Sequence, residues 1–88
     1  MTTVALMWEA RAVEGRGPEL LEWARAQAAQ LAREPDRREL FRAQQDRVLV
    51  ITWWNAELAD ELPELPEPAD ELITRAVHRW RFESAGTG

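Results

Sequence analysis

The fold is decided by the stretch Arg47-Val48-Leu49-Val50-Ile51-Thr52-Trp53-Trp54-Asn55. Its central residues, from Val48 to Trp54, are β-branched, aromatic or leucine, which is the composition of a β-strand. A strand with one wet face alternates apolar and polar residues, and this one does not. Both of its faces are therefore predicted to be buried, so other parts of the chain, or a partner, must cover each side.

Three further segments are typical of strands. The segment from Thr2 to Val13 is apolar on both faces at its start, whereas Arg38 to Gln45 alternates throughout. The last strand, Arg79 to Glu83, also alternates, and we expect Trp80 and Phe82 to point inward. Residues 84–88 are expected to form a frayed tail.

Two helices are expected between these strands. Pro18 suits the start of the first helix, and Pro35 should end it near Glu34. The second helical region follows Asn55, whose side chain suits an N-cap. We expect two turns over residues 56–62 and a resumed helix over 69–77, because the three prolines between them (Pro63, Pro66 and Pro68) forbid one continuous helix.

The predicted order of elements is β-α-β-β-α-β, the ferredoxin-like α+β arrangement, in one domain spanning residues 1–88. Its four-stranded antiparallel sheet has the order 4-1-3-2, so the first and third strands are central. Two helices cover only one face of such a sheet. Leu49, Ile51 and Trp53, or else their neighbours on the other face, would then face water. We therefore predict a homodimer with that exposed face as its interface.

Composition excludes several classes of site and partner. The chain has no Cys and a single His, so neither a thiolate site nor a histidine-rich metal site is expected. Its net charge of -5 argues against nucleic-acid binding. No apolar segment is long enough to span a membrane and no secretory signal follows Met1, so we expect a cytoplasmic protein.

The chain resembles the dimeric α/β-barrel superfamily, and within it the antibiotic-biosynthesis-monooxygenase type of domain. The resemblance extends from Val4 to Glu83, and its best local match is the segment Arg47–Leu58, a strand ending in Trp followed by a short polar step. The helix start Gly17–Leu21 and the helix end Glu34-Pro35 also fit. The resemblance implies a dimer whose sheet and helices enclose a cavity for a flat aromatic substrate, oxidised without a cofactor.

The sequence departs from that family at two places, and these departures limit which activities the resemblance implies. Many such domains carry a His in the second helix, where this chain has Asp60-Glu61-Leu62-Pro63. Haem-degrading relatives use an Asn on the first strand, where this chain has Trp8 and Glu9. Haem degradation is therefore not expected, although haem binding through His78 stays open as a hypothesis.

Five residues are candidates for a site. Trp8 and Trp54 lie on adjacent central strands and could form a wall for a planar ligand, or simply pack in the core or interface. His78 is the natural proton carrier, unless it only stabilises a helix C-terminus. Glu9 would be a usable base if buried, and Arg42 could hold an anionic substrate oxygen or form an edge-strand salt bridge.

Two hypotheses about function follow. The first is a small dimeric α/β-barrel protein that binds a small aromatic or polyketide-like ligand and, if catalytic, acts as a cofactor-independent monooxygenase. The second is a non-catalytic dimeric assembly or regulatory module whose Trp residues serve the core and interface. An open cavity between sheet and helices would favour the first.

Overall fold

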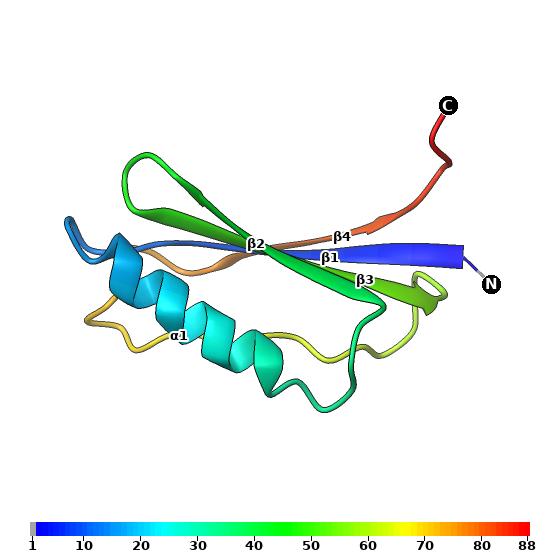
Figure 1. The fold of residues 1–88 in the computed structure, drawn as a ribbon, viewed down its shortest axis with the longest axis horizontal. Helices are drawn as coiled ribbons and strands as arrows, with labels where there is room; N and C mark the ends of the chain where they lie inside the picture. The colour runs from blue at the N-terminus through cyan, green and yellow to red at the C-terminus, as the bar shows by residue number, and fades with distance from the viewer. Residues whose placement is uncertain (1) are drawn as a thin grey trace.

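The computed structural model describes residues 2–88, which form one antiparallel sheet and one helix (Figure 1). The elements are β1 (Thr2–Arg11), α1 (Gly17–Ala29), β2 (Arg37–Ala43), β3 (Arg47–Ala56) and β4 (His78–Glu83). The strand order is β2-β3-β1-β4. It is the predicted order 4-1-3-2 read from the other edge, so the prediction that the first and third strands are central is confirmed.

The central pair β1–β3 runs in register from Thr2 opposite Ala56 to Arg11 opposite Arg47. The predicted tight hairpin between β2 and β3 is present, and its turn places Gln45 and Asp46 at φ values of 64° and 58°. This left-handed region disfavours most side chains but accommodates Asp and Asn. Asp46 is thus suited to the turn that sets the β2–β3 register.

Helix α1 buries the stripe Leu20, Ala24 and Ala28 against the sheet. Just before it, Arg16 donates hydrogen bonds of 2.8 and 3.0 Å to the Glu19 carboxylate. These bonds lower the pKa of Glu19 and raise that of Arg16. The helix ends at Ala29, so the prediction that it continues to about Glu34 was wrong: Leu31 packs on the core from the connection that follows.

The predicted second helix is absent from the described chain, and this is the main correction to the expected fold. Ala56 is the last residue of β3, and residues 57–77 form turns and extended chain on the same side of the sheet as α1 (Figure 1). Within residues 61–68, here called the proline strap, the buried positions are Leu62, Leu65 and Pro68. A burial period of three is that of polyproline II, not of an α-helix.

Side chains of the sheet hold the proline strap in place. The indole of Trp8 donates to the carbonyl of Pro66 at 3.3 Å, and the Arg79 guanidinium donates to the carbonyl of Leu65 at 2.7 Å. Arg81 donates to the carbonyls of Leu58 and Asp60, in the turn just before the strap. An extended strap makes no internal hydrogen bonds, so these donors satisfy carbonyls that a helix would have paired internally.

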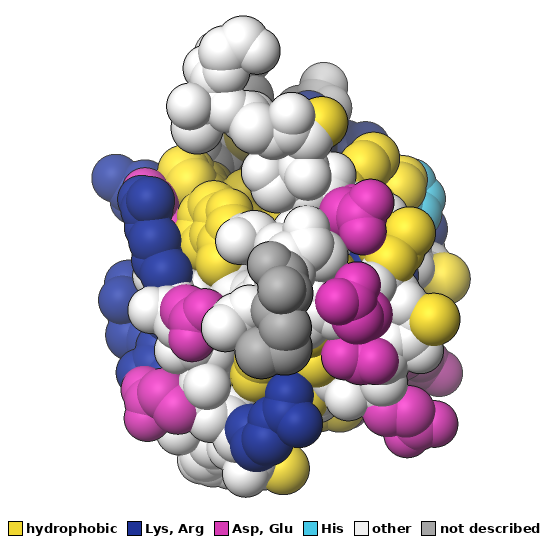
Figure 2. All heavy atoms as spheres, turned by 90° about the vertical axis from the view of Figure 1, so that its right-hand side faces the viewer, with side chains coloured by type: hydrophobic (Ala, Val, Ile, Leu, Met, Phe, Trp, Pro, Cys, Tyr) yellow, Lys and Arg dark blue, Asp and Glu magenta, His cyan; other side chains and the backbone are white. Residues whose placement is uncertain are grey.

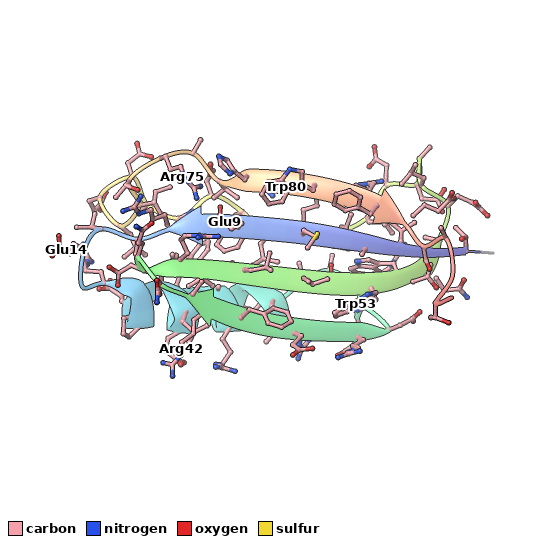
Figure 3. The ribbon with its side chains drawn as sticks, turned by 90° about the horizontal axis from the view of Figure 1, so that it is seen from above. Glu9, Glu14, Arg42, Trp53, Arg75 and Trp80 are labelled. Atoms are coloured by element: carbon pink, nitrogen blue, oxygen red, sulfur yellow. The ribbon has the colours of Figure 1, made fainter. Side chains whose placement is uncertain are left out.

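The two faces of the sheet differ sharply. On the helix side, Val4, Trp8, Val50 and Trp54 belong to the buried core. The other side, here called the open face, carries apolar side chains on all four strands, and no described element covers it (Figures 1 and 3). Those side chains are Ala5, Met7, Leu49, Ile51, Trp53, Phe41, Trp80 and Phe82.

The prediction that Trp80 and Phe82 point inward was wrong, because both lie on the open face with 45% and 54% of their surface exposed. The register pairs Trp80 with Met7, whereas Arg79 pairs with Trp8 on the helix side. On the helix side, Arg79 of β4 donates to the proline strap, and Arg81 donates to the chain just before it. Figure 2, seen from the end with the termini, shows hydrophobic atoms beside the raised C-terminal tail.

Asp46 also ties the hairpin to the start of α1, which gives a first prediction. Its carboxylate accepts hydrogen bonds from the backbone N–H groups of Gly15 and Gly17, at 3.0 and 3.1 Å. Asp46→Ala should lower the free energy of unfolding by about 1–2 kcal/mol, the usual cost of losing a cap. Urea unfolding followed by Trp fluorescence measures it.

Asp46→Asn is the matched control. It keeps one acceptor oxygen and tolerates the positive φ, so it should lose less than Asp46→Ala. Equal stability of the wild type and Asp46→Ala would contradict the role assigned to this carboxylate.

Candidate functional site

A pocket of about 410 Å³ opens on the open face, at the end of the sheet nearest the β2–β3 turn. Met7, Leu49 and Glu9 form its floor, and Phe41, Trp80 and His78 stand on the outer strands at its sides. Small-molecule pockets typically measure about 300–1,000 Å³ and are mostly apolar with a few polar groups. The pocket falls within that range and has that character.

Strand register brings these residues together. Across the sheet, His78 of β4 lies opposite Glu9 of β1, Glu9 opposite Leu49 of β3, and Leu49 opposite Phe41 of β2. One step along, Met7 lies opposite Trp80. Directly paired residues share a face, so the pocket draws on residues as far apart in sequence as Met7 and Trp80.

Glu9 is the centre of a charged group, here called the Glu9 cluster, with Arg47, Arg75 and His78. Arg75 Nη2 donates to Glu9 Oε1 and Oε2 at 2.6 and 2.9 Å, and Arg47 Nε donates to Oε2 at 3.1 Å. His78 Nδ1 lies 3.5 Å from Oε1. Figure 3 shows Arg75 directed toward Glu9 from the connection that precedes β4.

Burial within the cluster is unequal. The exposed side-chain fraction is 9% for Glu9, but 31% for Arg75, 48% for Arg47 and 51% for His78. A buried carboxylate without partners is strongly unfavourable, and the arginines compensate for its lost hydration. The two guanidiniums outnumber the one carboxylate, so the pocket is positive although the whole chain carries -5.

The structure brings together only part of the predicted site. Glu9 and His78 lie side by side on the open face, but Trp8 and Trp54 lie on the opposite face. Trp8 stacks on Trp23 at a centroid distance of 5.9 Å. Trp54 Nε1 donates to Thr52 Oγ1 at 2.8 Å. Both rings are packed as core residues, although Trp54 also borders a polar hollow of about 490 Å³ beside Arg33 and Glu34.

The cavity expected between sheet and helices does not lie beside Trp8. The space that Trp8 lines on the helix side measures only about 10 Å³, which is too small for an organic ligand. Arg42 borders the pocket of the open face, but its side chain lies at the outer edge of β2, away from Glu9 (Figure 3). Its partner across the hairpin is Val48, a residue of the helix side.

The predicted interface residues Leu49, Ile51 and Trp53 do share the open face, and each is half-buried. Arg37 lies over the Trp53 ring, with its guanidinium carbon 4.6 Å from the ring centroid. Sequence reasoning did not find Arg47 and Arg75. Arg47 lies two residues before Leu49 on the same strand, so its side chain is expected on the same face and it could have been found. Arg75 lies in the connection between β3 and β4, and only the course of that connection brings it to Glu9.

Residues 2–88 contain no group of three or more His, Cys, Asp or Glu side chains placed to hold a metal ion. No helix in this part of the chain is long and apolar enough to cross a membrane.

Comparisons with protein-family models, curated proteins and solved structures found no match to this chain.

Proposed function

We propose that this protein is a homodimer of the dimeric α/β-barrel, monooxygenase-like type, in which two copies pack open face to open face. We further propose that it binds a small aromatic or polyketide-like molecule in the pocket beside Glu9. The observation that carries both proposals is an apolar sheet face that no other part of the described chain covers.

The size of the open face supports a protein partner. Four strands about 4.8 Å apart and roughly 20–30 Å long give a footprint of about 400–600 Å². This lies in the upper part of the range of about 300–600 Å² found for the largest patch of a typical monomer, and such patches are often functional. A second copy offers a surface of the same shape and polarity, and a two-fold axis lets Ile51 and Trp53 of each copy meet their counterparts.

The pocket and the proposed dimer contact share Leu49, but they are centred on different ends of the open face. Glu9 and Leu49 lie toward the β2–β3 turn, whereas Ala5, Trp53 and Phe82 lie toward the opposite end. Phe41 and Trp80 flank the pocket on the outer strands. Aromatic and aliphatic walls of this kind suit a planar apolar ligand.

If the protein is catalytic, His78 is the residue that suits proton removal, because half of its side chain is exposed at the pocket. Both oxygens of Glu9 already accept hydrogen bonds from arginines, so Glu9 fits a positioning role. An acidic methylene group of an aromatic ligand, once deprotonated, can react with oxygen to give a carbonyl group and water. That balance requires no external reductant, and oxygen uptake with an anthrone tests it.

The packing of Trp8 and Trp54 favours a second candidate, a non-catalytic dimeric assembly or regulatory module. In that case the tryptophans serve the core, and the open face serves association alone. Dimerisation without ligand binding or oxygen uptake would select this function over the first.

Ile51→Glu tests the interface. The substitution places a charge at the centre of the open face, so it should convert a dimer of twice 10.2 kDa into a 10.2 kDa monomer in sedimentation equilibrium. The variant should stay folded, because the face lies open to water in the single chain.

Val13→Glu is the matched control, since Val13 is an exposed apolar residue in the connection between β1 and α1. It should leave the dimer intact. A wild-type protein that sediments as a monomer at every concentration would rule out the homodimer.

A further inference from the structure

We infer that the ligand of the open-face pocket is a flat organic anion, an aromatic carboxylate or phenolate whose oxygen is bound by Arg47 and Arg75. This inference rests on the proposed function, because it names the ligand class for the same pocket. It is carried by the geometry and charge of the Glu9 cluster together with the apolar side chains around it.

Arg47 supplies the more accessible donors. Only its Nε bonds to Glu9, and its two Nη groups have no hydrogen-bond acceptor among residues 2–88. A guanidinium presents its donors in a planar fork that matches a carboxylate, and such charge-assisted bonds are among the strongest in proteins. Arg47 therefore offers a ready fork at the rim of the pocket.

Arg75 supplies the second positive group. Its Nη2 bonds to Glu9, its Nη1 donates to the Ala76 carbonyl at 3.2 Å, and about a third of its side chain is exposed. Glu9 thus fixes both guanidiniums in place before a ligand arrives. Pre-ordered side chains lose less conformational entropy on binding, which strengthens association. Glu9 is in this sense a positioning residue.

The charges around the pocket favour a negatively charged ligand. Among residues 2–88, Glu9 is the only carboxylate that lines the pocket, and guanidinium donors already occupy both of its oxygens. A cationic ligand would therefore meet two arginines without a free acceptor, whereas an anion would meet unused donors.

The apolar part of the pocket selects a flat ring. Leu49 and Met7 form a floor between Phe41 and Trp80, which stand on the two outer strands. The Trp80 ring contacts His78 edge-on, with centroids 5.6 Å apart and planes at 74°. A ring that rests on Leu49 can place an attached oxygen at the arginines.

The test uses two probes that share a ring system and differ in charge. Isothermal titration calorimetry at about 0.15 M salt, where surface attraction is screened, compares 2-naphthoate with neutral 2-naphthalenemethanol. The acid should bind at least about tenfold more tightly than the alcohol, as expected for one charge-assisted hydrogen bond. Sedimentation of the same samples reports the oligomeric state.

Three variants test which residues cause the preference for naphthoate. Arg47→Gln should weaken naphthoate binding about tenfold and leave the alcohol unchanged, and Arg75 still holds Glu9 in this variant. Arg25→Gln changes the net charge equally but lies on the exposed side of α1, paired with Glu22, so it should have no effect. Trp80→Ala should weaken both probes, because it removes an apolar wall.

Equal affinity for the two probes would overturn the inference, as would equal losses in Arg47→Gln and Arg25→Gln. Failure of both probes to bind a protein that sediments as a dimer would also overturn the ligand class while leaving the dimer standing. A monomer that binds naphthoate selectively would support the inference and contradict the dimer.

Discussion

Trp8→Ala should lower the free energy of unfolding by about 3–5 kcal/mol, the usual cost of removing a buried Trp side chain. Trp8 is 4% exposed, stacks on Trp23 and donates to the Pro66 carbonyl, so its loss empties the space between sheet, helix and proline strap. Because domains of this kind are stable by only about 5–15 kcal/mol, a large share of the fold's stability would be lost. Urea unfolding followed by circular dichroism measures the change.

Trp80→Ala provides the matched comparison, since the same side chain is removed from the open face. It should cost roughly 1 kcal/mol or less in the single chain, because Trp80 is already half exposed. The comparison also bears on function. If Trp8 lined a ligand site, Trp8→Ala would abolish binding at little cost in stability, which is the outcome that contradicts the core role assigned to it.

Arg75→Gln should destabilise the protein by about 2–3 kcal/mol, and by more than Glu9→Gln does. Arg75 makes the two shortest contacts to Glu9, and its removal leaves the buried carboxylate with a single guanidinium at 3.1 Å. Breaking a buried ion pair costs about 3–5 kcal/mol, and we discount that figure because Arg75 is partly exposed and Arg47 remains. Urea unfolding of both variants measures the difference.

Glu9→Gln removes the carboxylate and leaves the two arginines. The two arginines lose their charged partner, but water reaches both guanidiniums, so we expect a cost of about 1 kcal/mol. In the double variant the uncompensated carboxylate is gone, and it should therefore be no less stable than Arg75→Gln alone. A larger loss in Glu9→Gln than in Arg75→Gln would show that burial of the carboxylate does not govern the cluster.

The sheet could be predicted because the two central strands are apolar on both faces, a pattern that is visible in their own sequences. The doubly apolar runs at Val4–Trp8 and Val48–Trp54 indicate strands with neighbours on both edges, and β1 and β3 are those strands. The alternation of side chains along each strand places Trp8 and Trp54 on one face of the sheet and Leu49 and Ile51 on the other. Which of the two faces lies under the helix depends on packing, and no local pattern reveals it.

The second helical region was wrongly predicted over 56–62 and 69–77 because Leu72, Ile73, Ala76 and Val77 recur at helical spacing. In the structure only Leu72 of these four is buried, and the segment forms turns instead of a helix. The prolines argued against a helix, and the extended segment receives donors from the sheet, from Trp8 and Arg79 on the strap itself and from Arg81 just before it. Those long-range partners are not visible in the sequence.

The candidate site could be predicted only in part for the same reason. Glu9 and His78 were identified by their chemistry, but their proximity depends on the β1–β4 register. Placing His78 at a helix end hid its position as the first residue of β4. Arg75 lies 66 residues from Glu9 in the chain, so only the tertiary path of the strap brings the two together.

The proline strap has a consequence for the entropy of the unfolded chain. Each proline fixes φ near -65° before folding begins, so Pro63, Pro66 and Pro68 leave the unfolded segment with fewer conformations to lose. Ordering an extended segment without internal hydrogen bonds is therefore less unfavourable than it would be for a flexible sequence of the same length. The rigidity of the unfolded strap therefore compensates in part for the cooperative backbone hydrogen bonds that a helix would have formed and the strap lacks.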